Sequence, residues 1–356
     1  MSAATAMKIN LRNDYGEGAH PRLLAALAGA SVEANHGYGL DGHSVRAAAL
    51  IRERCGCEAD VHFLAGGTQT NLVALGAFLR PHEAAVAASS GHIATHETGA
   101  IEAGGHKVLT VDTPDGKLTP ERIAPCLALH ASEHMVKPRL LYISNSTEWG
   151  TVYSAAEVAA LGAFCRERGL LFYVDGARLA SAFTVPGNDL DFAGLAAHAD
   201  AFYIGGTKNG ALLGEALVVV NPQLREDLRY IIKQRGAMLA KGMVIGAQFE
   251  ALFEDDLYLE LAAHANAQAQ VLREIVQRAG VPLAVDSPSN QVFPRLPDAV
   301  VARLQQQVEF ETWERCGDGS TVIRLMTSWA TTDATVEAFA QVFDAALAAG
   351  GGAPKA

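Results

Sequence analysis

A single lysine lies in a glycine-rich turn at the end of a short apolar run. Residues 202–204 read Phe-Tyr-Ile, and the turn that follows, 205–210, contains Lys208. The apolar run predicts a buried strand, and the glycines leave space beside the lysine. Two interpretations are open at this point. Either Lys208 caps the turn and points into water, or its amine is held in a site and forms a Schiff base with a carbonyl compound.

A carboxylate follows a second apolar run, because Asp175 comes directly after residues 170–174. A buried carboxylate needs a compensating partner, since desolvation of its charge is costly. Taken alone, Asp175 is also explained by a salt bridge to Arg178, three residues on. Together with Lys208, however, Asp175 fits pyridoxal phosphate. That cofactor needs a Schiff-base lysine, a carboxylate that keeps its pyridine nitrogen protonated, and an anion site for its phosphate.

The anion site is predicted at residues 65–71, where the strand 61–64 runs through a glycine turn into a helix at 72–79. Backbone N–H groups of Gly67 and Thr68 and the helix dipole would favour a negative charge there. The alternative is a tight connection with Thr68 as the N-cap. The glycine spacing matches neither a Walker loop nor a dinucleotide turn, which argues against a nicotinamide dehydrogenase.

Two histidines, His92 and His96, lie four residues apart on a helix predicted after Ser90 and Gly91. Residues at this spacing share one helix face. Such a pair could bind a metal with Glu97 nearby, but no third ligand has a diagnostic spacing, so we expect no metal. His92 is instead available to cover the ring of the cofactor.

Alternating strands and helices must bring these groups together. Apolar strands joined by helices predict a mostly parallel sheet covered by helices on both faces. In such α/β sheets ligands bind beyond the carboxyl ends of the strands. Polar groups follow three predicted strands, at 145–148, 175–178 and 207–208, and are therefore expected to converge. The strands are predicted at 61–64, 108–111, 140–144, 170–174, 201–204 and 216–220.

The pattern changes after Pro222. A basic helical stretch at 224–241 and a long helix at 244–278 are predicted first. Two short strands around Asn290, a helix at 298–307, a hairpin with 322–326 and a last helix at 333–348 follow, which together indicate a smaller α+β unit. We therefore expect a large domain at 1–243 and a small C-terminal domain at 244–356, with loosely held ends at 1–6 and 350–356.

Bulk composition narrows the class of partner and the compartment. The chain has 356 residues, and its 28 basic against 39 acidic side chains give a net charge of −11, which argues against nucleic acid as the main partner. Neither a secretory signal peptide nor an apolar run long enough for a membrane is recognisable. The cysteines are odd in number and scattered along the chain, which favours free thiols in a reducing cytoplasm. They are Cys55, Cys57, Cys126, Cys165 and Cys316.

The chain resembles the low-specificity threonine aldolases, which are fold-type I pyridoxal phosphate lyases related to the β-eliminating lyases. The resemblance runs from about Asn13 to Trp329 and is most specific in Asp-Gly-Ala-Arg-Leu at 175–179 and Gly-Gly-Thr-Lys-Asn-Gly at 205–210. Further matching pieces are Tyr38-Gly39, Gly67-Thr68, His92 with 97–99, and 324–329. The resemblance implies cleavage of L-threonine, L-allo-threonine and related β-hydroxy-α-amino acids to glycine and an aldehyde.

The resemblance also implies roles for individual residues, with pyridoxal 5′-phosphate as the cofactor. Lys208 forms the Schiff base, Asp175 pairs with the pyridine nitrogen and Arg178 lies near the phenolic oxygen. His92 stacks on the ring, and Gly67 and Thr68 hold the phosphate. Arg324 binds the substrate carboxylate, for which a planar guanidinium is well suited.

Three positions depart from the better-known members of that family. Glu148 appears where they have a second histidine near the substrate hydroxyl, which leaves Glu148, His92 and a bound water as candidate general bases. Gly66 replaces a serine of the phosphate turn. Asn13 replaces a serine close to the substrate carboxylate. The last two changes are expected to alter affinity or substrate choice rather than the reaction class.

Assembly and alternative functions also follow from the resemblance. Family members are dimers of dimers with sites at subunit interfaces, so a homotetramer is expected in which Tyr38 and Lys241 reach a neighbour's cofactor. An aminotransferase, a racemase or a β-eliminating lyase would use the same cofactor residues on the same fold. A non-catalytic α/β binding protein is the alternative from a different class.

Overall fold

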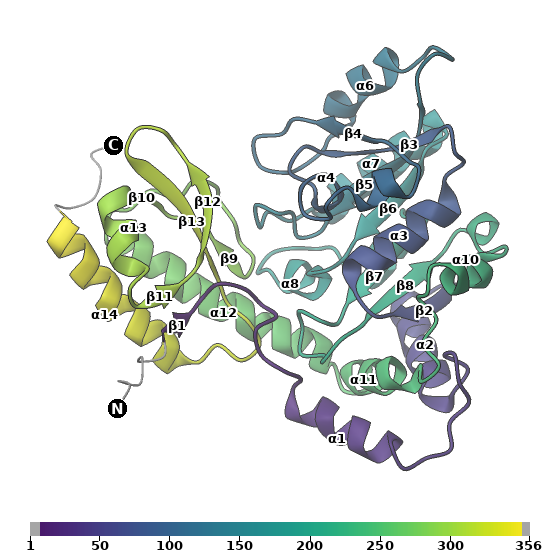
Figure 1. The fold of residues 1–356 in the computed structure, drawn as a ribbon, viewed down its shortest axis with the longest axis horizontal. Helices are drawn as coiled ribbons and strands as arrows, with labels where there is room; N and C mark the ends of the chain where they lie inside the picture. The colour runs from purple at the N-terminus through teal and green to yellow at the C-terminus, as the bar shows by residue number, and fades with distance from the viewer. Residues whose placement is uncertain (1–7, 351–356) are drawn as a thin grey trace.

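The computed structural model describes residues 8–350, and a seven-stranded sheet forms the centre of its larger part (Figure 1). Six strands run in one direction and β8 alone runs against them, so the predicted mostly parallel sheet is confirmed. In sheet order the strands are β2 (Asp60–Leu64), β8 (Glu215–Val219), β7 (Ala201–Gly205), β6 (Leu171–Asp175), β5 (Lys137–Ser144), β3 (Glu83–Ala88) and β4 (Val108–Val111).

Side chains of successive residues point to opposite faces of this sheet and enter two separate cores. On β5, for example, Leu141 and Ile143 belong to one core and Leu140 and Tyr142 to the other. Helices and some loop residues supply the remaining apolar residues of both cores. The first core contains residues of α1 (Pro21–Ala30), α2 (Gly42–Cys55), α6 (Pro120–Leu129), α7 (Ala155–Arg168), α8 (Leu179–Phe183), α9 (Phe192–Ala196) and α11 (Met243–Glu254). The second core contains residues of α3 (Gly67–Phe78), α4 (His92–Thr95), α5 (Ala100–Ala103) and α10 (Leu228–Gln234).

The C-terminal part has its own core beneath an antiparallel sheet in the order β10-β13-β12, with β9 also paired to β13. The strand β1 (Ile9–Asn10) pairs with β11 (Val308–Glu309), so the described chain begins against the C-terminal part. The domain boundary expected at residue 243 stays a prediction. The other elements are α12 (Leu257–Arg278), β9 (Gln291–Val292), β10 (Arg295–Pro297), α13 (Asp298–Leu304), β12 (Glu311–Arg315), β13 (Ser320–Met326) and α14 (Asp333–Gly350).

Several predicted elements differ from the structure. The long helix expected at 244–278 is wrong, because α11 and α12 are separated at Asp255 and Asp256, where Asp256 has a left-handed φ of 59°. The helix expected at 224–241 shrinks to α10, and the helix expected at 298–307 ends at Leu304. The ends expected to be loose lie outside the described residues, except Gly350, which ends α14.

A backbone contact joins the strand ends that carry the acid and the lysine. The N–H of Gly205 donates to the carbonyl of Gly176 at 2.9 Å. A Cβ at Gly176 would overlap the carbonyl oxygen of Tyr203, and one at Gly205 would overlap the carbonyl oxygen of Ala177. Only glycine permits this approach, which places the turn after β6 directly against the turn after β7.

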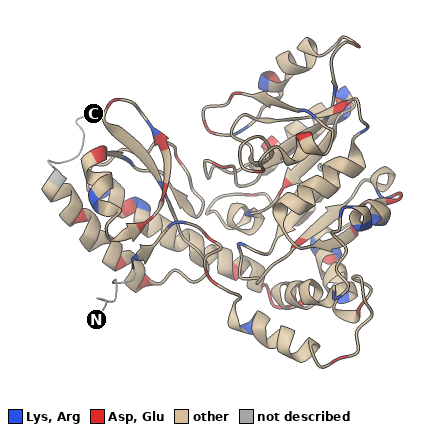
Figure 2. Ribbon diagram, in the orientation of Figure 1, with Lys and Arg blue, Asp and Glu red and all other residues tan. Residues whose placement is uncertain are grey.

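Acidic and basic side chains are distributed over both parts of the chain (Figure 2). All five cysteines are free thiols. Among the helices at 8–350, none is both long and apolar enough to cross a membrane.

Candidate active site

Lys208 lies in the turn between β7 and β8, where Gly206 and Thr207 donate backbone hydrogen bonds to the carbonyl of Gly214. Its side chain lines a small cavity rather than extending into solvent. Burial and the charge of Arg178 lower the pKa of Lys208 from its ordinary value, although nearby acids oppose the shift. A lowered pKa favours the neutral amine that attacks a carbonyl. The other lining residues include Asp14, Arg178, Asn209, Tyr258 and Asn290.

Asp175 ends β6 in a fully enclosed hydrogen-bond network. Its carboxylate accepts from the hydroxyl of Tyr142 at 2.5 Å, from the side-chain amide of Asn71 at 3.1 Å and from the N–H of Ala177 at 3.0 Å. Burial alone would raise the pKa of Asp175, but the charge of His92 and the hydrogen bonds from Tyr142 and Ala177 lower it. The buried acid is therefore held as a carboxylate, as a protonated pyridine nitrogen requires.

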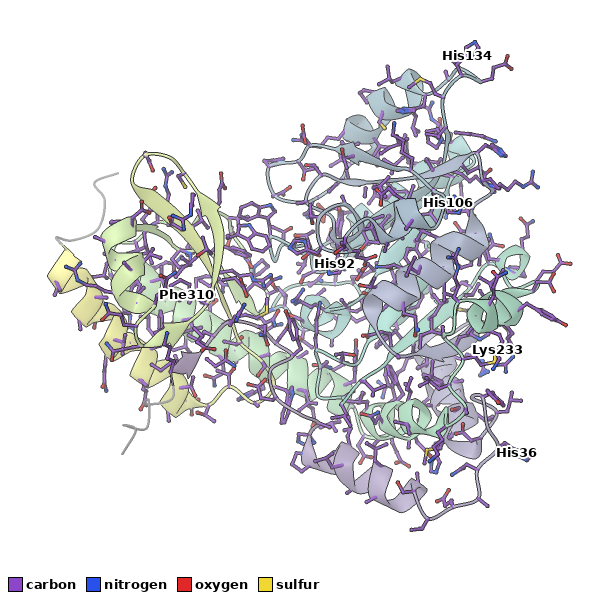
Figure 3. All side chains as sticks on the ribbon, viewed as in Figure 1. His36, His92, His106, His134, Lys233 and Phe310 are labelled. Atoms are coloured by element: carbon purple, nitrogen blue, oxygen red, sulfur yellow. The ribbon has the colours of Figure 1, made fainter. Side chains whose placement is uncertain are left out.

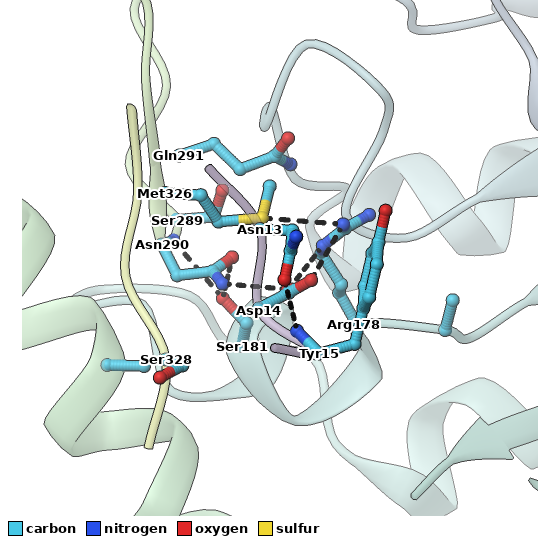
Figure 4. A network of polar contacts seen from close by, with 12 residues as sticks. Asn13, Asp14, Tyr15, Arg178, Ser181, Ser289, Asn290, Gln291, Met326 and Ser328 are labelled. Atoms are coloured by element: carbon cyan, nitrogen blue, oxygen red, sulfur yellow. Dashed lines mark hydrogen bonds and ion pairs between the residues drawn. The ribbon is translucent and has the colours of Figure 1, made fainter. Parts of the chain in front are cut away.

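Arg178 pairs with Asp14, not with Asp175, so the salt bridge considered from the sequence is wrong (Figure 4). The Nε of Arg178 lies 2.7 Å from Oδ2 of Asp14, and its Nη2 lies 3.0 Å from Oδ1. The amide of Asn290 donates to the same carboxylate at 3.1 Å. Both charged side chains are buried. Although burial opposes both shifts, mutual attraction lowers the pKa of Asp14 and raises that of Arg178.

Asp14 is a site residue that the sequence does not predict, whereas its neighbour Asn13 is predicted to contact the substrate. Nothing local distinguishes the two residues within a polar turn, and the partner of Asp14 lies 164 residues away. Asn13 accepts a hydrogen bond from the N–H of Tyr15 at 3.1 Å, as Figure 4 shows. A substrate role for Asn13 stays a prediction.

His92 is held by a carboxylate at the start of the short helix α4. Its Nδ1 lies 2.8 Å from Oε1 of Glu97, which also accepts from the side-chain amide of Asn71 at 2.8 Å. Burial opposes the change, but Glu97, Glu148 and Asp175 together raise the pKa of His92. The ring stacks on that of His96 at 5.5 Å, which confirms the shared face. No group of three metal-ligating side chains occurs in the described part of the chain.

The helix α3 begins at Gly67, so its N-cap is Gly66 and the interpretation of Thr68 as N-cap is wrong. Gly66 has no side chain to bind the first N–H groups, and the first turn contains no acid. A Cβ at Gly67 would lie 3.0 Å from the hydroxyl of Tyr203. The uncapped helix N-terminus is suited to an anion such as a phosphate.

Arg324 projects from β13 of the C-terminal part and is buried. Burial and the charge of Arg178 lower its pKa. Its Nε has no hydrogen-bond partner among the described residues, and its guanidinium carbon lies 4.9 Å from the ring centre of Trp313. A buried guanidinium with a free donor is suited to a carboxylate ligand, which would satisfy that donor.

Glu148 and Tyr38 occupy different surroundings. Glu148 follows β5, is buried, and acts electrostatically on His92, Lys208 and Arg324. Tyr38 instead lies in a loop beside α10, 45% exposed, with the amine of Lys233 4.5 Å from its ring centre. Tyr38 is thus separate from the cavity of its own Lys208.

The chain is similar to known proteins in sequence and in fold. A family model described as beta-eliminating lyase matches residues 10–298. The low specificity L-threonine aldolase of Pseudomonas aeruginosa is 33% identical over 90% of this chain and 92% of its own. The solved threonine aldolase of Leishmania major is 47% identical, with a TM-score of 0.93 over 94% of this chain and 98% of that one. A mutant aspartate aminotransferase of Thermus thermophilus is 16% identical, and the match covers 96% of this chain and 92% of that one with a TM-score of 0.73. At this identity the likeness shows a shared fold alone.

Replacing Asp14 by Asn should lower the free energy of unfolding at pH 7 by about 3–5 kcal/mol, because Arg178 is left buried without a charged partner. The folded pKa of Asp14 is below its ordinary 3.8, so its contribution is complete above that pH and is lost as pH falls through the lowered value. The deficit of Asp14→Asn should therefore shrink below pH 4 in urea titrations across pH.

A matched control is available at the exposed pair between Arg22 and Asp255, whose atoms are 2.7 Å apart. Asp255→Asn should change stability by only about 0–1 kcal/mol, since solvent screens that pair. Equal losses from the two substitutions would contradict the importance of the buried pair.

Proposed function

Because this chain belongs to the beta-eliminating lyase family, we propose that it is a pyridoxal-phosphate-dependent aldolase, a carbon–carbon lyase. Its substrates are L-threonine, L-allo-threonine and related β-hydroxy-α-amino acids, which it cleaves to glycine and an aldehyde. The observation that supports this most is the proximity of Lys208, Asp175 and Arg324, because Asp175 acts electrostatically on Lys208 and Arg178 acts on both Lys208 and Arg324. The uncapped start of α3 adds an anion site. The names of the relatives in Pseudomonas aeruginosa and Leishmania major support the substrate class.

The described residues fit the cofactor in charge and hydrogen-bonding capacity. Lys208 would hold pyridoxal phosphate through its amine, Asp175 would pair with the pyridine nitrogen, and Gly67 and Thr68 would receive the phosphate. His92 would cover the ring. Arg178 keeps its Nη1 outside the pair with Asp14, where it can serve the phenolic oxygen. When bound, the cofactor supplies an acceptor for the electrons of the broken Cα–Cβ bond.

The chain's own residues orient the substrate and move its proton. Arg324 would fix the α-carboxylate through its unsatisfied Nε. The raised pKa of His92 favours its protonated form, which has no free site for another proton. Of the two side chains considered as the base, Glu148 is the one that remains, and it is buried and acts electrostatically on Lys208. We assign Glu148 as the base that takes the β-hydroxyl proton, with His92 holding the cofactor ring.

The surface around Tyr38 supports assembly with further copies. Tyr38 is 45% exposed, Leu40 and Val45 are both 60% exposed, and Tyr230 of α10 is 77% exposed. Exposed apolar clusters mark contact surfaces. In a homotetramer, built as a dimer of dimers, Tyr38 and Lys241 would approach the cofactor of a neighbour. Cytoplasmic location is supported by the five free thiols, which suit a reducing compartment.

The reaction class is tested with diastereomers of β-hydroxy-α-amino acids. The holoenzyme should release glycine and aldehyde in equal amounts without any keto acid, because the bond broken is Cα–Cβ. Lys208→Ala should reduce turnover to background and remove the visible Schiff-base absorbance, whereas Lys137→Ala, an exposed lysine at the start of β5, should retain both. Undiminished turnover by Lys208→Ala would refute the assignment, and keto acid formation would indicate an aminotransferase or a β-eliminating lyase.

The assignment of the base is tested by Glu148→Gln, which keeps the shape of the side chain but removes its proton affinity. We expect kcat to fall by about 10²–10⁴-fold while the Schiff-base absorbance is retained. His92→Asn should reduce kcat less and shift that absorbance, because His92 contacts the cofactor. If Glu148→Gln keeps kcat, the base is His92 or a bound water.

Sharing of sites between subunits is tested by complementation. Tyr38→Ala and Lys208→Ala should each have little activity, and sizing should show both as oligomers. After the two variants are mixed and reassembled, activity should recover to about a quarter of wild type, since half of randomly mixed dimers contain one intact site of two. No recovery above the separate variants would place Tyr38 outside a shared site.

A further inference from the structure

Aromatic rings from both parts of the chain meet beside the candidate active site. Trp313 on β12 lies 5.4 Å from Trp149 and 5.3 Å from Phe293, measured between ring centres. Trp313 also stacks on His96, with ring centres 6.2 Å apart and an interplanar angle of 16°. These separations are those of favourable aromatic pairs. We call Trp149, Trp313 and His96 the aromatic wall.

The aromatic wall is joined to the residues assigned to substrate and cofactor. Trp313 contacts the guanidinium of Arg324, and His96 stacks on His92. Trp149 follows Glu148 directly in the chain. The wall thus borders the carboxylate-binding group, the ring-covering group and the proposed base at once. The β-substituent of a substrate held by Arg324 and Glu148 has this wall as its apolar neighbour.

Exposure distinguishes the wall from ordinary core. Phe293 behind it is completely buried, whereas Trp149 and Trp313 are only partly buried and His96 is exposed. The surrounding groups Arg324, Glu148 and His92 are charged or polar, so the partly exposed indole rings of Trp149 and Trp313 are the apolar surface there. An aromatic ring placed against them would lose water contact and gain edge or stacking contacts, which a methyl group provides to a much smaller extent.

We propose that the aromatic wall is the subsite for the β-substituent and that it selects aryl-bearing β-hydroxy-α-amino acids, of the phenylserine type, over threonine. This inference rests on the proposed aldolase function and specifies its substrate class. Trp313 is the principal specificity-determining residue because it contacts both His96 and Arg324. Selection between substituents appears as a difference in kcat/KM, since both substrates undergo the same bond cleavage.

The test compares kcat/KM for aldehyde release from L-threo-phenylserine and from L-threonine by the holoenzyme. Wild type should favour phenylserine by about tenfold or more. Trp313→Ala should reduce this ratio by about tenfold, and Trp313→Phe should retain most of it. Phe310→Leu is the matched control, because Phe310 lies just before β12 and packs on the C-terminal core, away from His92 (Figure 3). It should leave the ratio unchanged.

A merely structural role of Trp313 has a different signature. If Trp313 only holds Arg324, Trp313→Ala would weaken both substrates equally and leave the ratio unchanged, which would overturn the proposal. If Trp313→Ala does not fold, His96→Ala must lower the ratio in its place. A wild-type preference for threonine would reject the aromatic subsite while leaving the aldolase function intact. Release of aldehyde from neither substrate would reject the aldolase function itself.

Discussion

The buried ion pair between Asp14 and Arg178 connects three segments that are distant in the sequence. Asp14 belongs to the N-terminal segment, Arg178 to the turn after β6, and Asn290, which donates to Asp14, to the C-terminal part. Two desolvated charges of this kind are tolerated only when their partners and hydrogen bonds are complete. The ion pair beside Lys208 is therefore complete only when both parts of the chain are docked against each other. Formation of the site thus depends on formation of the whole fold.

Local charge in the site differs from the charge of the whole protein. The chain has a net charge of −11, yet the charge of Arg178 lies close enough to both Lys208 and Arg324 to help lower the pKa of each. The buried carboxylates of Asp14, Asp175 and Glu148 act in the opposite direction on Lys208. Cations and carboxylates therefore balance within the site, while the whole protein is acidic, because site charge and net charge act at different ranges.

The sequence predicts the position of a candidate site residue best where that residue lies at or just after a strand end. Lys208, Asp175 and the turn at Gly67 follow strands, and parallel strands bring such ends to one edge. The sequence predicts less where the interaction partner of a residue lies far away in the chain, or where the residues of an element have little preference for its conformation. The buried strand β3 reads Glu-Ala-Ala-Val-Ala-Ala, which has only one β-branched residue, Val86, and its sheet neighbours decide its conformation. Trp313 had no local motif, since its role arises only where β12 faces α4 and Arg324.

The pairing of the first strand with a late one determines when the site is complete during synthesis. β1 pairs with β11, and the N–H of Met326 donates to the carbonyl of Leu11 at 2.9 Å. The Lys208 turn closes locally between adjacent strands, whereas Asp14 cannot be fixed until residues beyond 308 have left the ribosome. The large sheet can thus form early around an amine that still lacks its neighbouring ion pair. The cofactor can consequently bind in its final surroundings only late in the synthesis and folding of the chain.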